Sequence, residues 1–586
     1  MSKYLVTLQH SIFILISFFI CLTLSSQKKQ NVLFIGVDDM RPLINSYGYP
    51  QMKTPNLDKL ASEGVQFDQA YTNIAVCGAS RASILTGVRG SKSRFVKYYS
   101  RADEDLPKAV TLAKLFKQNG YTTGSIGKIY HEWRDNRDEW DIYRNFREQR
   151  DYQSKKTLRM IEKRKEINPN QPNNYIGPAW EYADVEDDAY TDGKLTDFAI
   201  KTLSNFKDSQ DPFFLAVGYV SPHLPFIQPK KYGEMYDDSD LTISREKTIP
   251  KNAHNRSYHN WEELRNGYLD IPKKGPVSLE TEKELIKSYY ASVSYLDALV
   301  GKLIKSLDDL GLRDTTTIVF WSDHGFFLGE HGFWCKHHTF QEAIHVPLII
   351  SAPNMAKNEK TDALVEYVDI YPTLSELAGL EAPDYIHGES LVPILKNPSQ
   401  KFKSEIYSRY QMREVVQDLD YSYHEIIGYN KFFKDRNGNN TPSPDSDERV
   451  VAKMLFDMRT DKLQTIDISN EPKYKEIVEK QLVLLCVRSK MLKKMQNISK
   501  RPRHKKFTSS QRGCSATALS AADALALPRA CCDCSHDGCG GSRVPADSIS
   551  IGIVGRSQRR NGGIHVKLPR VKSEALPEPT FDAEIV

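Results

Sequence analysis

The chain has 586 residues, more than one ordinary hydrophobic core can hold, so two packed domains with appendages are expected. Its formal charge of +5 is unevenly spread. From Ser499 onward 14 Lys and Arg stand against 8 Asp and Glu, which leaves 66 against 67 in the rest of the chain. This nearly neutral body argues against a general affinity for nucleic acid.

The first residues have the layout of an export signal. Lys3 precedes an apolar run from Ile12 to Leu24, and Ser25-Ser26-Gln27 follows. The run is shorter than a membrane span requires, and no later segment is apolar enough to cross a bilayer. The sequence therefore predicts a signal peptide over residues 1–26 and an exported protein, periplasmic or secreted, without stable membrane insertion.

Apolar runs alternate with amphipathic patterns along most of the chain. The runs predicted as buried strands are Asn31–Val37, Phe213–Tyr219, Thr316–Trp321 and Val346–Ser351. One predicted helix starts at Thr54-Pro55, a cap and an N1 proline, and ends at Gly64, and another covers Thr281–Leu310. This alternation predicts an α/β fold around a mostly parallel sheet over residues 27–400.

The pattern changes beyond residue 400. Short alternating segments occur at Glu405–Tyr410, His424–Phe433 and Met454–Met458, and a charged amphipathic helix is predicted over Pro472–Met495. Residues 401–498 are therefore expected to form a small subdomain with an antiparallel sheet and a terminal helix. Residues 499–586 lack sustained periodicity and are rich in Ala, Ser, Gly and Pro, which predicts a tail that is disordered or foreign to the domain.

Polar side chains follow three of the predicted strands. Asp38-Asp39 comes after the first strand, His223 after the second and Asp323-His324 after the third. Chemistry in α/β folds collects beyond the carboxyl ends of the strands, so these side chains are expected to meet. Carboxylates from two strand ends suit a hard cation. The alternative is that both pairs are ordinary caps and turns.

Cys77 is a candidate for special chemistry. Five of the nine cysteines lie in the tail and Cys21 lies in the signal, which leaves Cys77, Cys335 and Cys486 in the body. Cys77 opens the stretch Cys-Gly-Ala-Ser-Arg, followed by Ala-Ser-Ile-Leu-Thr-Gly. A lone cysteine in such a glycine-flanked, hydroxyl-rich segment indicates a special role, whereas the structural alternative is a buried cysteine at a helix N-terminus.

The stretch that begins at Cys77 resembles the activation motif of type I sulfatases, in which a maturase oxidises the first residue to formylglycine. Asp38-Asp39 upstream and Ser322-Asp323-His324-Gly325 downstream resemble two further blocks of the family, in the same order. The resemblance implies an alkaline-phosphatase-like sulfatase fold, with a large mostly parallel sheet flanked by helices and a smaller C-terminal subdomain. Ala79 occupies a position where many sulfatases have Pro. The bacterial maturation machinery of the family tolerates Ala at this position.

The resemblance also implies how a cation is held. The residues at the positions that bind a divalent cation in these sulfatases, usually calcium, are Asp38, Asp39, Asp323 and His324, together with the formylglycine made from Cys77. Arg81 would hold the formylglycine hydroxyl with a guanidinium that does not deprotonate. His324, where Asn is more common, matches the iduronate-2-sulfatase branch.

A sulfate ester also requires cations around the sulfuryl group and a proton acceptor. The segment Gly-Lys-Ile-Tyr-His contains Lys128 and His131 and resembles the G-K-x-x-H block of the family. The resemblance implies that Lys128 binds a sulfate oxygen and that His131 accepts a proton when sulfate is released.

The leaving alcohol requires an acid. The segment Ser-Pro-His-Leu-Pro-Phe around His223 resembles the P-H-x-P-F block, and Lys336 ends the segment Gly-Phe-Trp-Cys-Lys. The resemblance implies that His223 and Lys336 protonate or polarise the bridging oxygen. His345 is expected to have a supporting or structural role.

Within the family the likeness is greatest to the iduronate-2-sulfatases, in segments such as Val37–Pro42 and Tyr290–Asp297. This implies a partner substrate that is a sulfated carbohydrate, with the 2-O-sulfate of a uronic acid as the bond cleaved. Two alternatives remain open. One is a phosphomonoester or phosphonate hydrolase on the same scaffold, with a Ser or Thr nucleophile and usually two metals. The other is a carbohydrate-binding relative that is never matured.

Overall fold

A computed structural model describes residues 29–146, 151–167, 176–209, 211–269 and 271–486. The predicted signal peptide and tail therefore lie outside the described residues. The described residues belong to one compact unit. No helix in these ranges combines the length and apolar character needed to span a membrane.

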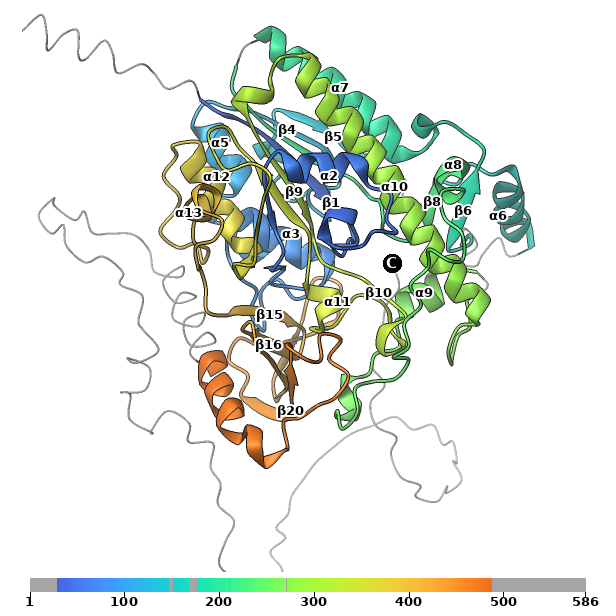
Figure 1. The fold of residues 1–586 in the computed structure, drawn as a ribbon, viewed down its shortest axis with the longest axis vertical. Helices are drawn as coiled ribbons and strands as arrows, with labels where there is room; N and C mark the ends of the chain where they lie inside the picture. Colours follow the sequence, from blue (N-terminus) through green and yellow to red (C-terminus); the bar gives the residue numbers. More distant parts are fainter. Residues whose placement is uncertain (1–28, 147–150, 168–175, 210, 270, 487–586) are drawn as a thin grey trace, which may run out of the picture. The chain divides into compact units, whose positions relative to one another are not determined.

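A sheet of eight strands forms the centre of the fold (Figure 1). The strands, in spatial order, are β13 (Glu359–Thr361), β2 (Val65–Phe67), β12 (Leu348–Ser351), β9 (Thr316–Ser322), β1 (Asn31–Val37), β7 (Phe213–Gly218), β4 (Thr122–Gly127) and β5 (Ile142–Arg144). Only β12 pairs antiparallel with its neighbours in this sheet. The central strands β1, β7 and β9 are buried along their whole length, as continuous apolar runs require. The prediction of a mostly parallel sheet is confirmed.

Helices lie to either side of β1 and β9. The helices are α2 (Pro55–Ser62), α3 (Cys77–Thr86), α4 (Ala102–Asp105), α5 (Leu112–Gln118), α6 (Lys155–Ile167), α7 (Thr191–Ser209), α8 (Lys230–Gly233), α9 (Glu262–Gly267), α10 (Leu279–Asp309), α11 (Gln341–Ile344), α12 (Ile370–Leu377) and α13 (Val392–Lys396). The long helices α7 and α10 pack against each other, while α3 packs against α5 and α12 (Figure 1). This is the layered arrangement that an α/β fold predicts.

The start of α2 differs from its prediction in one respect. Thr54 is the N-cap residue, but its hydroxyl accepts a hydrogen bond from the Asn45 amide at 3.0 Å and caps nothing in α2. The carboxylate of Asp297, on α10, accepts instead from the amides of Asn56 at 3.1 Å and Leu57 at 2.8 Å. The first turn of α2 is therefore capped from a distant helix, because a carboxylate satisfies two free amides at once.

A second sheet of four antiparallel strands follows in the chain. Its strands are β15 (Ile406–Tyr410), β16 (Arg413–Gln417), β17 (Tyr421–Tyr429) and β20 (Glu448–Asp457). Side chains alternate between its faces, so Ile406 and Phe456 join the main core while Tyr407 and Leu455 pack with side chains of a helix over residues 475–486. The predicted antiparallel sheet and packed helix are confirmed as far as the described residues extend.

Four short two-stranded sheets complete the described structure. They pair β3 (Ala70–Tyr71) with β14 (Val365–Glu366), β6 (Trp180–Ala183) with β8 (Phe226–Pro229), β10 (Phe327–Leu328) with β11 (Trp334–Cys335), and β18 (Phe432–Lys434) with β19 (Asn440–Pro442). Of these, β10 and β11 matter for the site, because Lys336 directly follows β11.

Candidate active site

The carboxyl ends of four adjacent strands meet at one edge of the large sheet. The register pairs Val37 of β1 with Ser322 of β9, and Gly218 of β7 with both Gly36 of β1 and Gly127 of β4. Since these strands are parallel and end level with one another, the residues that follow them are placed together. The strand order alone therefore brings Asp38, Asp323 and Lys128 to one place.

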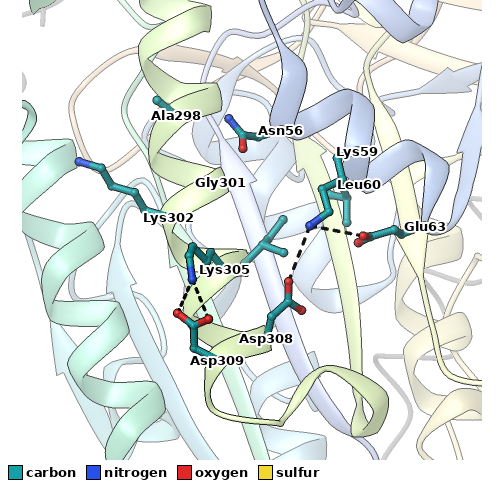
Figure 2. Close-up of a pocket in the computed structure, with 11 residues that line it drawn as sticks. Asn56, Lys59, Leu60, Glu63, Ala298, Gly301, Lys302, Lys305, Asp308 and Asp309 are labelled. Carbon is teal, nitrogen blue, oxygen red and sulfur yellow. Dashed lines mark hydrogen bonds and ion pairs between the residues drawn. The ribbon is translucent and has the colours of Figure 1, made fainter.

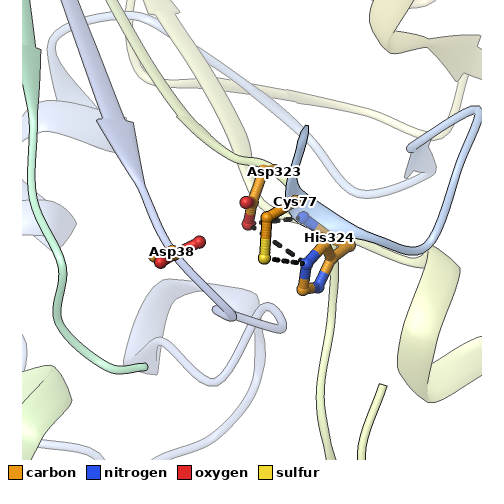
Figure 3. Close-up of side chains that lie close together, drawn as sticks. All are labelled: Asp38, Cys77, Asp323 and His324. Atoms are coloured by element: carbon orange, nitrogen blue, oxygen red, sulfur yellow. Dashed lines mark hydrogen bonds and ion pairs between the residues drawn. The ribbon is translucent and has the colours of Figure 1, made fainter. Parts of the chain in front are cut away.

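Three of the four predicted cation ligands, Asp38, Asp323 and His324, form one buried cluster with Cys77. One ligand atom from each of Asp38, Cys77, Asp323 and His324 lies within 4.8 Å of all the others (Figure 3). The Cys77 Sγ is 3.2 Å from His324 Nε2. Asp39 and Cys77 form a second such group with His223. The structure thus brings together side chains that are far apart in the sequence.

Cys77 is the first residue of α3 and is buried. A Cβ on the next residue, Gly78, would lie 1.8 Å from the carbonyl oxygen of Tyr98, so only glycine fits behind the cysteine. Burial raises the pKa of the Cys77 thiol well above its ordinary value, and Asp38 and Asp323 add to this effect. The unmodified thiol is therefore a poor source of thiolate at neutral pH.

Arg81, one turn after Cys77 on α3, donates hydrogen bonds to residues at the ends of several strands. Its Nε donates to Asp323 Oδ2 at 2.9 Å, and its Nη2 donates to Asp38 Oδ1 at 3.2 Å and to the Val37 carbonyl at 3.0 Å. Its Nη1 donates to the carbonyl of Lys128. The guanidinium is fully buried and so are both carboxylates. A planar five-donor group suits this position, since it contacts the ends of three strands at once.

Lys128 and His131 follow β4. The Lys128 ammonium pairs with the Asp38 carboxylate. Burial raises the pKa of Asp38, but Lys128 and Arg81 outweigh burial and hold it well below its ordinary value. His131 packs edge-on against the Tyr98 ring at 5.6 Å, and burial together with Lys128 lowers its pKa well below 6.5. Its imidazole is therefore neutral at pH 7 and able to accept a proton.

A second group of charges surrounds Lys336. Its Nζ donates to Asp39 Oδ2 at 2.9 Å and to Glu263 Oε1 at 2.7 Å, and it lies 3.3 Å from His223 Nε2. Burial lowers the pKa of His223, but Asp39 outweighs burial and the result is a raised pKa. The Nδ1 atom of His223 donates to the Leu224 carbonyl at 2.5 Å, so Nε2 faces the site. Both predicted acids therefore point to the same place.

Glu263 was not predicted from the sequence. It lies on the short helix α9, its Oε1 is 3.2 Å from His223 Nε2, and its Oε2 is buried without a hydrogen-bond partner. Burial raises its pKa, but Lys336 and His223 outweigh burial and hold the pKa well below 4.5. No motif contains it, and its partners are distant in the chain. Only the fold could identify it.

Several of these residues have an unusual backbone. Asp39 has φ 64°, and the residues on either side of Lys336, Cys335 and His337, have φ 69° and 76°. Residues without glycine's freedom adopt this region at a cost in free energy, and such strain concentrates at functional sites. The loop that carries His223 is held differently, since Asp192 accepts from the amides of Val220 at 3.0 Å and Ser221 at 2.8 Å.

The donor set fits a hard divalent cation. Asp39 Oδ1 is buried and has no hydrogen-bond partner, although it lies 3.4 Å from His324 Nε2. The Nδ1 atom of His324 donates to the Gly325 carbonyl at 3.0 Å, so Nε2 is the ring nitrogen that faces the carboxylates. Asp38, Asp323 and His324 share a buried position and Asp39 adds a carboxylate beside His324, and such donors suit calcium or a similar ion.

His345 lies apart from this cluster in its contacts. Its Nε2 donates to the Asp68 carbonyl at 2.8 Å, and its ring packs against Tyr71 at 5.4 Å. These contacts fix the segment between α11 and β12, which is a structural role for His345.

A surface groove of about 550 Å³ lies elsewhere, between α2 and α10. Figure 2 shows that Lys59 pairs with Asp308 and Lys305 with Asp309. Lys302 pairs instead with Asp187, which does not line the groove. None of the predicted site residues lines it.

Comparison with known proteins identifies the family and the fold. The sulfatase family model matches residues 30–380. Iduronate 2-sulfatase of Homo sapiens is 32% identical over 459 residues, covering 70% of this chain and 81% of the relative. Two solved structures share the fold at 20% identity and a TM-score of 0.60. One, in complex with its substrate D-glucosamine-2-N,6-O-disulfate, covers 81% of this chain and 100% of that chain. The other, a phosphonate monoester hydrolase from Silicibacter pomeroyi, covers 79% and 95%.

The chain therefore belongs to the sulfatase family, and its enzyme class is that of the sulfuric ester hydrolases. The predicted alkaline-phosphatase-like sulfatase fold is confirmed by the shared architecture of the solved structures.

Replacing Glu263 by glutamine is expected to lower kcat about 10-fold, because a neutral amide no longer fixes the Lys336 ammonium and the His223 ring by charge. Steady-state kinetics with an aryl sulfate would measure this, with Glu262→Gln on the same helix as the matched control. An unchanged kcat in Glu263→Gln would show that Asp39 alone is enough to position Lys336.

Proposed function

We propose that this protein removes sulfate from a sulfated sugar of a polysaccharide or oligosaccharide, cleaving the 2-O-sulfate of a uronic acid. A formylglycine formed at Cys77 by a maturase would supply the oxygen nucleophile. The observation that carries the proposal is the meeting of Cys77 with Asp38, Asp323 and His324 in one buried cluster. The likeness to iduronate 2-sulfatase supports the choice of substrate.

The charges of the site support an assignment of proton transfers. Lys336 and His223 lie 3.3 Å apart on one side of Cys77's cluster, and either can give a proton to the bridging oxygen as the sulfur–oxygen bond breaks. His131 is neutral because burial lowers its pKa, and so it can accept the proton that is lost when sulfate leaves position 77. Lys128 and Arg81 stabilise the negative charge of the sulfuryl oxygens.

A divalent cation, proposed to be calcium, would be held by Asp38, Asp39, Asp323 and His324, with the modified residue 77 beside it. When bound, it would supply a positive charge that stabilises the developing charge of the transition state. The buried, partnerless Asp39 Oδ1 supports this assignment. Arg81, Lys128 and Lys336 hold the carboxylates of Asp323, Asp38 and Asp39 in place by hydrogen bonds.

Calcium added to metal-free protein is expected to raise the melting temperature, because a ligand that binds the folded state stabilises it by mass action. In Asp39→Asn the rise is expected to be much smaller, since the site loses a charged ligand. Differential scanning calorimetry with and without a chelator would measure both. The assignment would be wrong if the two proteins gained the same stability from calcium.

The proposed reaction is tested with a panel of defined sulfated oligosaccharides and purified protein that was co-expressed with a maturase. Free sulfate and the desulfated position are read out together. Aryl sulfate and aryl phosphate are compared alongside, because a phosphomonoester or phosphonate hydrolase on this scaffold would favour the phosphate. A preparation that hydrolyses neither but binds oligosaccharides would instead support the unmatured, carbohydrate-binding alternative.

Export is also part of the proposal. Its support is the charged, apolar and small-residue layout of residues 1–26. Fractionation of the native host, followed by N-terminal sequencing of the exported protein, is expected to show a start near Gln27. Full-length protein confined to the cytoplasm would contradict it.

A further inference from the structure

The hairpin between β15 and β16 reaches the edge of the active site. The ring of Tyr410, the last residue of β15, packs 5.3 Å from the ring of His337, which follows Lys336 in the chain. Burial raises the pKa of the Tyr410 phenol, whereas the charge of Arg413 lowers it, and the charges of Glu263 and Lys336 act on it in opposite directions. The second sheet therefore contributes side chains beside the cluster that would hold the scissile sulfate.

Arg413, the first residue of β16, lies opposite Tyr410 in the hairpin. Its Nη2 donates to the carbonyl oxygens of Arg256 at 2.9 Å and Tyr258 at 3.4 Å, while its Nε is buried and has no hydrogen-bond partner. No carboxylate in the described part of the chain lies within ion-pair distance of its guanidinium. Burial lowers the pKa of Arg413, and only the Tyr410 phenol opposes this effect.

This lack of a counter-ion distinguishes Arg413 from the other cations of the site. Arg81, Lys128 and Lys336 each pair with a carboxylate. A guanidinium that is partly removed from water without an opposite charge costs free energy, and a bound anion would recover that cost. The carbonyl contacts fix the side chain without neutralising it.

We propose that Arg413, with Tyr410 beside it, binds a second anionic group of the substrate, separate from the sulfate that is cleaved. This proposal rests on the proposed function and assigns to Arg413 and Tyr410 the recognition of a second oxyanion of the sugar. The second anion is either the carboxylate of a uronic acid or a further sulfate, since the planar guanidinium fork matches both. Arg413 is thus a residue that determines specificity and takes no part in bond cleavage.

The test compares Arg413→Gln with the parent on four substrates. These are 4-nitrophenyl sulfate, which has no second anion, a 2-O-sulfated uronate disaccharide, its carboxyl-reduced counterpart, and a disaccharide with one further sulfate. Arg413→Gln is expected to lower kcat/KM about 10- to 100-fold on the disaccharide that carries the recognised anion, mainly through KM. On 4-nitrophenyl sulfate the change is expected to stay within about twofold.

The substrate pairs identify the anion. If the carboxylate is recognised, its reduction lowers kcat/KM of the parent and removes the difference between parent and variant. If the further sulfate is recognised, parent and variant differ on the disaccharide with one further sulfate and match on the other substrates, and carboxyl reduction has no effect on their ratio. Arg413→Lys is expected to lie between parent and Arg413→Gln, because it keeps the charge but loses the fork.

The matched control is Arg449→Gln, which removes an exposed cation from β20 of the same sheet and is expected to match the parent on all substrates. Two results would overturn the Arg413 proposal: a variant equal to the parent on every sugar, or an equal loss on 4-nitrophenyl sulfate, which would indicate a structural role. A parent that releases no sulfate from any sugar would instead refute the proposed function, and this proposal with it.

Discussion

Cys77→Ala is expected to release sulfate at least about 10⁴-fold more slowly than the parent while remaining folded. The proposed oxygen nucleophile can form only from the side chain at this position, and no other nucleophilic residue of the described cluster could replace it. The cost to stability is small, about 1 kcal/mol, because a single buried sulfur atom is removed. Sulfate release from 4-nitrophenyl sulfate and the melting temperature would be measured on the same samples.

The matched control is Cys486→Ala, in the helix over residues 475–486, which is expected to keep full activity. Peptide mass analysis of active parent protein should show residue 77 as formylglycine, in which an aldehyde oxygen replaces the thiol sulfur and two hydrogens have been lost. The nucleophile would be assigned wrongly if Cys77→Ala kept a tenth of the parent's activity, or if a fully active preparation carried an intact Cys77 thiol.

Arg81→Ala is expected to give the largest loss of stability of any single change in the site, about 3–5 kcal/mol. The substitution leaves Asp38 and Asp323 buried without the guanidinium that pairs with both. It also removes donors from the carbonyls of Val37 and Lys128, which end β1 and follow β4. Chemical denaturation with urea, followed by circular dichroism, would measure the free energy of unfolding.

Arg81→Lys separates charge from geometry. It keeps one positive charge but cannot reach both carboxylates and the carbonyls with a single ammonium, so an intermediate stability is expected. Added calcium should recover part of the loss in both variants if the cation neutralises the same carboxylates. If Arg81→Ala unfolded at the same urea concentration as the parent, the buried ion pairs would contribute no net stability.

Much of the fold could be predicted because its signals are local. The run Asn31–Val37 is continuous and apolar, and β1 has these bounds. The predicted strand Thr316–Trp321 and helix Thr281–Leu310 differ from β9 and α10 by one or two residues at their ends. Burial on both faces of a parallel strand leaves a strong signature in the sequence. The capping of α2 by Asp297 left no such signature, because the helix that supplies it is far along the chain.

The site divides in the same way. Cys77, Lys128 and His223 belong to short motifs and could be identified from residue order alone. Glu263 and Arg413 belong to no motif. Their significance comes from neighbours that are distant in sequence, such as Lys336, which lies 73 residues beyond Glu263.

The sequence by itself determined the α/β class, the order of the polar blocks and the position of the candidate nucleophile. Only the tertiary structure decided which charges pair and which lack a partner. The physical reason is that strand register and the packing of the second sheet set the distances between side chains, and electrostatic interactions depend on those distances and on burial. The carboxylate of Glu263 between two cations, and the guanidinium of Arg413 without a counter-ion, are consequences of that packing.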